Sequence, residues 1–410
     1  MTTTVNNEHK NIKVPNLRFP EFQGEWKNTT IGEIATIKNG PFGSVLHAED
    51  YVDEGMPIVT TEHFKSGNLP LSKNGIPQVS EDDYCRLKGY MLETDDIVFS
   101  RVGSVDINAH VEHVQQGWLF SGRVLRVRPI KSVNSLCLHY VLSTESVKRD
   151  IRNRAVGQTM PSINTPILSN TGIYMSQSEA EQKKIANLLS LIDERIATQN
   201  KIIEDLKKLK SAIIDYAINS LNTDFAKFGS LYEMAGEGGT PTTSNASFYD
   251  NGKIPFIKID DLKQKYLTEN KDFITELGLQ KSSAWLVPTH SILFSNGATI
   301  GEISITTYPV CTKQGILGIV PKQNIDVEFL YYFMSSSYFK KAVSRIVTEG
   351  TMKTAYLKDI NNILCPIPTK EKQQEIAKMP SALNSKIDFE QSILKLFCSQ
   401  KQYLLRQMFI

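Results

Sequence analysis

Two histidines and one glycine-rich stretch are the residues whose spacing first suggests chemistry. His110 and His113 form an H-x-x-H pair, which could contribute two imidazoles to one metal ion, but no third ligand lies nearby in the sequence. A plain surface strand is the favoured interpretation there, and we expect no metal site. Residues 236–239 are rich in glycine but do not lead into a helix as a phosphate-binding loop would, so they are interpreted as a turn.

Motifs of common enzymes are missing from the sequence. There is no G-x-x-x-x-G-K-[ST] phosphate loop and no H-E-x-x-H metal motif. The chain also has no Pro-Pro pair, which the catalytic tetrapeptide of an adenine methyltransferase requires. We therefore expect no catalytic residues and a chain that is not an enzyme by itself.

Length and composition are those of a folded chain with several domains. A chain of 410 residues is expected to form two or three domains, and 40% hydrophobic with 22% charged residues is typical of globular proteins. No apolar run approaches the eighteen residues that a membrane span needs. The net charge of +2 is too small to predict nucleic-acid binding from bulk charge.

The first residues and the cysteines bear on localisation. The first fifteen residues lack the apolar segment of a secretory signal and are expected to form a flexible arm. The five cysteines are scattered without a C-x-x-C pair, which favours reduced thiols over disulfides or a zinc knuckle. We expect a cytoplasmic protein.

An internal repeat organises the chain. GMPIVTTEHF from Gly55 matches GKIPFIKIDDL from Gly252, and IVFSRVGSVDI from Ile97 matches ILFSNGATIGEI from Ile292. Farther along, identical residues recur at an offset of about 192 positions. These pairs are Leu125 with Leu317, Pro129 with Pro321, Tyr140 with Tyr332, Ser143 with Ser335, and Met160 with Met352. The chain is therefore expected to contain two copies of one plan.

Each copy ends in a long helix whose apolar residues recur at 3-4 spacing, which is typical of a coiled-coil seam. The predicted seam residues of the first helix are Ile185, Leu189, Ile192, Ile196, Ile203, Leu206 and Ile213, and those of the second are Ile376, Leu383, Ile387, Leu394, Phe397 and Leu404. Polar residues interrupt both seams at equivalent places, Gln199 and Lys210 in the first and Glu390 and Lys401 in the second. This recurrence favours helices that pair with each other, and the alternative is a long helix packed only on its own domain. Pro380 predicts a kink, or the start of the regular helix, near that residue.

The predicted fold class is α+β, with two β-rich domains related by duplication and separated by two long helices in an antiparallel coiled coil. The expected segments are a flexible arm (1–15), a first domain (16–177), a central helix (178–221), a second domain (222–369) and a distal helix (370–410). A helix of about 44 residues is about 65 Å long at 1.5 Å per residue.

Several motifs resemble the specificity subunits of type I restriction–modification enzymes. PNLRFPEFQGEWKNTTIGEIATIKNG near the N-terminus looks like the opening of such subunits, and SQSEAEQKKIANLLSLIDERI looks like the start of their central helix. GGTPTTSNASFYDNGKIPFIKIDDL, SNGATIGEI and the GTM segment leading to IPTKEKQQEIA resemble their second target-recognition domain and its run into the distal helix. The resemblance covers nearly the whole chain after residue 15.

The resemblance implies a division of labour. In that family each globular domain reads one half of a split, non-palindromic site in double-stranded DNA, and the paired helices set the gap between the halves. The helices also dock two methyltransferase subunits, and restriction–translocase subunits join that core. S-adenosylmethionine, ATP and Mg²⁺ are expected on those partners, with no cofactor bound by this chain.

Two physical arguments agree with that implication. Modules that read one face of B-DNA typically lie about 34–36 Å apart, a distance that a helical spacer of this size could supply. The two copies also differ in polar loops, KNGPFGSVLHAEDY in one and EGGTPTTSNASFYD in the other. Identical readers related by a two-fold axis would require a palindrome, whereas divergent readers require an asymmetric site.

Candidate DNA contacts are basic residues for phosphates and Arg, Lys, Asn, Gln, Ser or Thr for base edges, on loops of the β-rich domains. In the first domain they are Lys38, Asn39, Ser44, Lys65, Arg101, Asn108, Arg123, Gln158 and Thr159; in the second they are Thr240, Thr242, Lys258, Lys263, Lys265, Asn296, Lys313, Gln314, Thr351 and Lys353. For each, a solvated surface residue or a turn former is the competing interpretation. Arg126 and Arg128 alternate with valines along a strand and are interpreted as structural residues of its face.

Two other functions remain open at this point. One is a coiled-coil adaptor whose β-rich domains bind proteins, which predicts no salt-dependent affinity for DNA. The other is a free-standing nuclease or methyltransferase, which the missing motifs disfavour.

Overall fold

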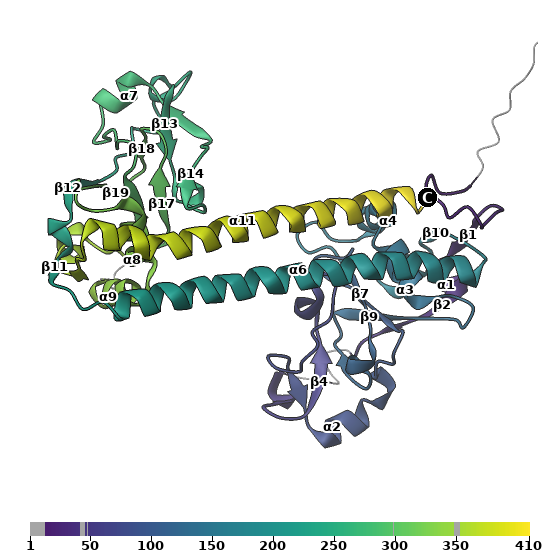
Figure 1. Ribbon diagram of the computed structural model, residues 1–410. Coiled ribbons are helices and arrows are strands. Elements are labelled where there is room, and N and C mark those ends of the chain that lie inside the picture. Colours follow the sequence, from purple (N-terminus) through teal and green to yellow (C-terminus); the bar gives the residue numbers. More distant parts are fainter. Residues whose placement is uncertain (1–12, 42–45, 47, 298, 348–352) are drawn as a thin grey trace, which may run out of the picture. The chain divides into compact units, whose positions relative to one another are not determined.

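The computed structural model describes residues 13–41, 46, 48–297, 299–347 and 353–410 (Figure 1). The chain divides into two compact units, one formed by residues 1–198 and 394–410 and the other by residues 199–393. Among the described residues, none of the helices is both long and apolar enough to cross a membrane. Most of the expected N-terminal arm, residues 1–12, lies outside the described residues.

The first unit is built on a four-stranded antiparallel sheet in the order β2-β9-β6-β7. A smaller sheet has the order β3-β5-β4-β8, with β4 and β8 parallel, and β1 pairs antiparallel with β10. The strands are β1 (Lys27–Thr30), β2 (Ala35–Asn39), β3 (Tyr51–Val52), β4 (Met56–Val59), β5 (Gln78–Val79), β6 (Ile97–Ser100), β7 (Asn108–His110), β8 (Leu119–Phe120), β9 (Val124–Pro129) and β10 (Gly172–Met175). The helices are α1 (Ile31–Ile34), α2 (Glu81–Arg86), α3 (Ser135–Leu142), α4 (Glu145–Arg154) and α5 (Thr165–Ser169), with 3-10 turns η1 (Ala48–Asp50), η2 (Thr61–Phe64), η3 (Lys88–Tyr90) and η4 (His113–Gln115).

Strand alternation explains how this sheet buries both faces. Successive side chains of a strand point to opposite faces. Phe99 and Leu125 lie in one core with residues of α3, whereas their neighbours Val98 and Val124 lie in a second core that the smaller sheet helps to form. All four residues of β6 are buried, as its continuous apolar sequence predicts.

The second unit repeats this plan. Its main sheet has the order β12-β19-β16-β17-β14, and a smaller sheet has the order β15-β13-β18 with β13 and β18 parallel. The strands are β11 (Phe225–Lys227), β12 (Tyr232–Glu237), β13 (Ile254–Ile257), β14 (Tyr266–Leu267), β15 (Asp272–Ile274), β16 (Ile292–Ser295), β17 (Ile303–Thr306), β18 (Cys311–Thr312), β19 (Ile316–Pro321) and β20 (Leu364–Pro366). The helices are α7 (Glu276–Gln280), α8 (Val327–Ser335), α9 (Ser337–Ile346) and α10 (Leu357–Ile360), with 3-10 turns η5 (Phe228–Ser230), η6 (Ala246–Phe248) and η7 (Ile259–Asp261). Strands β12, β19, β16 and β17 are the counterparts of β2, β9, β6 and β7, so the duplication in the sequence is a duplication of the fold.

The two long helices are α6 (Glu179–Asn219) and α11 (Lys370–Gln407), and they pair antiparallel within each unit. In the second unit, Gln199 donates to the Glu390 carbonyl at 3.1 Å and Lys210 donates to Asn384 at 2.9 Å. In the first unit, Lys401 lies 2.5 Å from Asp193. The polar interruptions of the seam therefore contact polar residues of the opposite helix.

The predicted seam residues are buried or half-buried, and none is exposed. Helix α11 begins ten residues before Pro380 and continues through it, so the regular helix does not start near that proline. Two buried glutamines also tie the long helices to the domains. Gln182 accepts from the backbone N–H of Asn134 at 2.8 Å, and Gln373 accepts from that of Asp326 at 2.7 Å. Asn134 and Asp326 in turn cap helices α3 and α8.

Candidate nucleic-acid interface

Each unit has a surface cleft at the junction of its two sheets. The first cleft has a volume of about 490 Å³ and is lined by Pro41, Leu46, Tyr51, Thr60, Thr61, Glu62, Ser121, Gly122 and Arg123. The second cleft has a volume of about 630 Å³ and is lined by Glu237, Thr240, Lys258, Ile259, Asp260, Gly297, Thr299, Lys313, Gln314, Gly315, Thr354 and Tyr356. In both, the lining comes from the turn after β4 or β13, the end of β2 or β12, and the loop before β9 or β19. The two clefts are equivalent positions of the repeat.

In one wall of each cleft, the end of a strand passes close to the backbone of the opposite loop. A Cβ atom on Gly40 would lie 1.9 Å from the carbonyl oxygen of Ser121, and one on Gly238 would lie 2.2 Å from that of Thr312. Both glycines directly follow the first long strand of their repeat. Only glycine therefore allows the strand end to pass this close to the opposite loop.

A capped turn forms another wall. The N–H of Thr60 donates to Nδ1 of His63 at 3.0 Å, and at the equivalent place the N–H of Lys258 donates to Asp261 at 2.9 Å. Burial lowers the pKa of His63, which keeps its ring neutral and able to accept this bond. The turn thus has one backbone geometry built with two different side chains.

The third shared contact is a backbone hydrogen bond between the residue that follows β6 or β16 and the loop that lines the cleft. The N–H of Arg101 donates to the Arg123 carbonyl at 2.9 Å, and the N–H of Asn296 donates to the Gly315 carbonyl at 3.0 Å. Arg101 also donates through its guanidinium to the Gly122 carbonyl at 3.1 Å. The backbone frame is conserved between the repeats while the residue at this position differs.

The side chains that line the two clefts differ in kind. The first presents two threonines, Glu62 and Arg123, while the second presents Lys258, Lys313 and Gln314 with Thr240. These types include donors and acceptors that can read base edges, and cations that can contact phosphates. The clefts therefore offer the same shape class with different hydrogen-bonding groups.

Six of the predicted DNA contacts belong to these clefts or their walls: Arg101, Arg123, Thr240, Lys258, Lys313 and Gln314. Two more lie at the cleft turns, where exposed Lys65 pairs with Glu62 and exposed Lys263 pairs with Asp260 at 3.2 Å. Lys258 itself pairs with Asp272 at 2.7 Å. Sequence reasoning thus found four of the twelve residues that line the second cleft.

The other predicted contacts lie elsewhere. Asn39 accepts a hydrogen bond from Thr165 at 3.2 Å. Gln158, Thr159, Thr242 and Lys353 are exposed, and Lys353 lines a different pocket. Ser44 and Thr351 lie outside the described residues.

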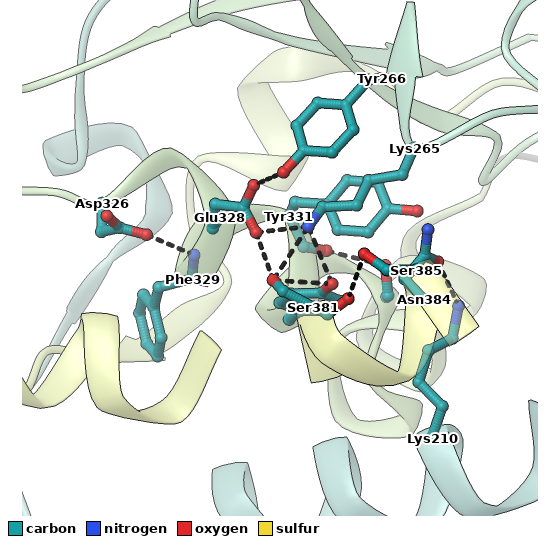
Figure 2. Close-up of polar contacts among 12 residues, drawn as sticks. Lys210, Lys265, Tyr266, Asp326, Glu328, Phe329, Tyr331, Ser381, Asn384 and Ser385 are labelled. Carbon is teal, nitrogen blue, oxygen red and sulfur yellow. Dashed lines mark hydrogen bonds and ion pairs between the residues drawn. The ribbon is translucent and has the colours of Figure 1, made fainter. Parts of the chain in front are cut away.

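Three predicted contacts have side chains in the interior rather than on loops. Asn108, on β7, is 2% exposed and bonds to Ser143 and His139. Asn296 is 1% exposed. Lys265 is 6% exposed, and its ammonium donates a hydrogen bond to Tyr332 of α8. Figure 2 shows this ammonium surrounded by polar groups of the second unit. These three side chains are not placed to contact DNA, because each faces the domain core.

Sequence reasoning missed the turn residues Thr60, Thr61 and Glu62 of the first cleft. The signal was the alignment of GMPIVTTEHF with GKIPFIKIDDL, which places Thr60 opposite Lys258 directly after a buried strand. His110 Nε2 lies 3.2 Å from Asp95, and the described part of the chain contains no group of three or more His, Cys, Asp or Glu side chains that could hold a metal ion.

The fold and clefts define a duplicated protein with two equivalent, differently lined surface sites and long paired helices. The model of the type I restriction modification DNA specificity domain matches this chain twice, over residues 23–208 and 222–396. The chain therefore belongs to the family of DNA specificity subunits of type I restriction–modification enzymes.

Relatives agree with this assignment. The MjaVIII specificity subunit of a type I restriction enzyme from Methanocaldococcus jannaschii is 23% identical over 91% of this chain and 89% of its own length. The MjaIX specificity subunit from the same organism is 32% identical over 40% of this chain and 38% of its own length. The crystal structure of a type I restriction–modification S subunit from M. genitalium superposes with a TM-score of 0.58 at 18% identity, covering 97% of this chain and 99% of that one. At that identity the superposition shows a shared fold.

Proposed function

We propose that each cleft reads one half of a bipartite, asymmetric site in double-stranded DNA. The observation that supports this most strongly is the equivalence of the clefts: three shared backbone contacts hold the same frame, yet the polar side chains that line it differ. Base edges in the major groove are distinguished by donor and acceptor patterns. Two equivalent clefts with different donors and acceptors would therefore select two different half-sites.

The paired helices are proposed to set the gap between the half-sites and to dock two methyltransferase subunits. Their polar contacts, such as Lys210 with Asn384 and Lys401 with Asp193, support a fixed register, because a slip of the seam would separate these partners. Restriction–translocase subunits would join this core. Methyl transfer and cleavage, with S-adenosylmethionine, ATP and Mg²⁺, are assigned to those partners, and this chain is proposed to contribute recognition without catalysis.

Reconstitution with the methyltransferase subunits tests the proposed recognition. The complex should methylate DNA at one split, non-palindromic sequence, and its affinity should fall steeply with salt because phosphate contacts release counterions. Methylation at no split site would overturn the proposal. Affinity for a protein with no salt-dependent DNA binding would instead favour an adaptor.

A change of spacer length tests the role of the helices. Insertion of seven residues within 201–210 keeps the heptad register and lengthens the helix by about 10 Å. The two half-site sequences should stay the same while the gap between them changes. An unchanged gap would show that the helices do not set it.

A further inference from the structure

Two cations lie directly opposite each other on one face of the first main sheet. Lys38 of β2 and Arg126 of β9 are register partners, and Arg126 is also opposite Val98 of β6. Val98 lies in the core that the smaller sheet covers, so the two cations extend that face toward the β2 edge. Like charges directly opposite on a sheet are destabilising, so this pair needs an explanation.

Lys38 has a carbonyl and an aromatic ring as partners, whereas Arg126 has no acidic partner among the described residues. Lys38 donates to the Gly89 carbonyl at 2.7 Å and lies 4.8 Å from the ring centroid of Tyr90. The side chain of half-buried Arg126 has no hydrogen bond or ion pair among the residues that the structure describes, and its Nε is buried.

The nearest acids are already engaged. Arg128 lies 2.7 Å from Asp96 and 2.6 Å from Glu93, so these carboxylates neutralise Arg128. Burial lowers the pKa of Arg126 and the charge of Arg128 lowers it further, while the charges of Asp96 and Glu93 raise it only in part. The guanidinium therefore lies in a place that favours an added negative charge.

The second repeat shows that the fold does not need these cations. The positions of Lys38 and Arg126 are occupied by Gly236 and Gly318, which are both covered by the ring of Trp285. A Cβ on Gly318 would lie 2.8 Å from that ring and 2.5 Å from Val287. No long side chain fits there, so the cation pair is a property of the first repeat alone.

The cation pair is close to the first cleft. Lys38 of β2 is three residues before Pro41, which lies just past the end of that strand, and Arg126 of β9 is three residues after Arg123, which directly precedes that strand. At 3.2–3.4 Å per residue, each cation lies about 10 Å along its strand from the cleft lining. We propose that Lys38 and Arg126 form a binding site for a DNA backbone phosphate beside the first half-site, with no counterpart in the second repeat. This rests on the proposed DNA recognition.

Salt dependence of DNA affinity in the full complex with methyltransferase subunits tests the site. Each lost phosphate contact reduces the slope of log K against log salt by about 0.9. Arg126→Gln should therefore lower the slope by up to about 0.9, and the double variant Lys38→Gln/Arg126→Gln by about 0.9 in total because both cations share one phosphate, with the half-site sequences unchanged. Arg126→Lys should retain most of the wild-type slope. Lys131→Gln, an equal change of charge on an exposed residue past the other end of β9, is the matched control and should leave the slope unchanged.

Neutral phosphates identify the contacted group. Methylphosphonate placed singly along a duplex bearing the site should weaken wild-type binding at one position beside the first half-site, and that same substitution should have little effect on the Arg126→Gln complex. If every neutral phosphate weakened both complexes equally, Arg126 would bind a free phosphate ion or an acidic protein surface, and the proposal would be wrong. Loss of all sequence-specific binding by the wild-type complex would instead refute the proposed function, so the two failures are distinguishable.

Discussion

The two repeats join the same helix to the same sheet through different buried polar groups. In the first repeat, His139 of α3 makes a 2.7 Å hydrogen bond to Asn108 of β7, and His110 on that strand lies 6.4 Å from it, ring centre to ring centre. In the second repeat, the position of His139 is taken by Tyr331. The Lys265 ammonium lies 5.8 Å from the ring centroid of Tyr331 and bonds to Tyr332 at 2.9 Å, to Ser381 of α11 at 3.0 Å, and to Glu328 (Figure 2).

This difference shows what duplication preserves. The strand order, the helix caps and the glycine approach at each cleft are shared, because each depends on backbone geometry. Buried polar groups need only be satisfied by some partner, and either two neutral imidazoles or one ion pair can do this. The buried polar groups therefore differ between the two repeats, as the side chains that line the clefts do.

Alanine substitution of the cleft glycines should have the largest effect, and each substitution should affect only the repeat that carries it. Gly40→Ala and Gly238→Ala each place a methyl group about 2 Å from a backbone carbonyl, which should cost about 3 kcal/mol or more in the stability of that unit. Gly40→Ala should impair reading of one half-site and Gly238→Ala reading of the other, as measured by methylation of duplexes with each half randomised. Gly172→Ala is the control for a general effect of adding a methyl group, since the nearest atom to its Cβ position is 3.9 Å away and its φ is not positive. Equal loss at both halves in either cleft variant would contradict separate readers.

Removal of the Lys265 charge should destabilise the second unit only. Lys265→Met leaves the partly buried carboxylate of Glu328 without its cation, at a cost of about 2–3 kcal/mol. Lys65→Met removes an exposed pair with Glu62 in the first unit and should leave the stability of that unit nearly unchanged. Peptide-resolved hydrogen exchange measures both, and the faster exchange should be confined to β14, β17 and α8. Unchanged protection there would show that the network contributes nothing to the unit.

Acidification should weaken the first unit before the second. Burial lowers the pKa of His139 to about 3, and it also lowers the pKa of His110, whereas an unfolded histidine has a pKa of about 6.5. Below that value the unfolded chain binds more protons than the folded one, so stability is full above pH 6.5 and falls as the pH drops. His139 alone should cost about 2 kcal/mol by pH 5.

Hydrogen exchange of the two units from pH 7.5 to 5, corrected for intrinsic rates, measures this loss. His139→Gln should flatten the pH dependence of the first unit, while the same change at exposed His113 should not. A first unit that keeps its full protection at pH 5 would contradict the buried, neutral histidine.

The smallest expected difference lies in the paired helices. Asp193 accepts from Tyr140 at 2.8 Å and from Lys401 at 2.5 Å, whereas in the second unit Lys210, the equivalent of Lys401, donates to the neutral Asn384, the equivalent of Asp193. Asp193→Asn would make the first unit resemble the second and should cost about 1 kcal/mol in thermal unfolding. The effect should shrink at high salt, since part of it is ionic. No change in either condition would show that the two crossing contacts are equivalent in energy.

Backbone features were predictable from the sequence to the extent that they repeat. The matched segments predicted two copies of one fold, and the 3-4 spacing from Ile185 onward predicted a seam whose residues are buried or half-buried in the structure. The same pattern could not show that α11 continues through Pro380. Burial of residues on both sides of the proline holds the helix together, and apolar spacing alone does not reveal that burial. Ala377 and Ile387, which flank the proline, are both buried.

Residues of the candidate site could be predicted only where a polar residue of the sequence is also exposed in the structure. Lys258, Lys313 and Gln314 are exposed polar residues next to buried strands, and the structure places them in the second cleft. Lys265 and Asn108 are polar residues as well but point into the core, because strand pairing decides which face a side chain takes. A single sequence does not give that pairing for short strands such as β14.

The central claim is that two unlike clefts on one frame each read half of one DNA site. Replacement of residues 16–177 by the corresponding domain of another specificity subunit, followed by methylome sequencing of cells that carry the complex, tests it most directly. One half of the methylated sequence should change, while the other half and the gap remain. A methylated sequence in which both halves change, or neither, would contradict the account.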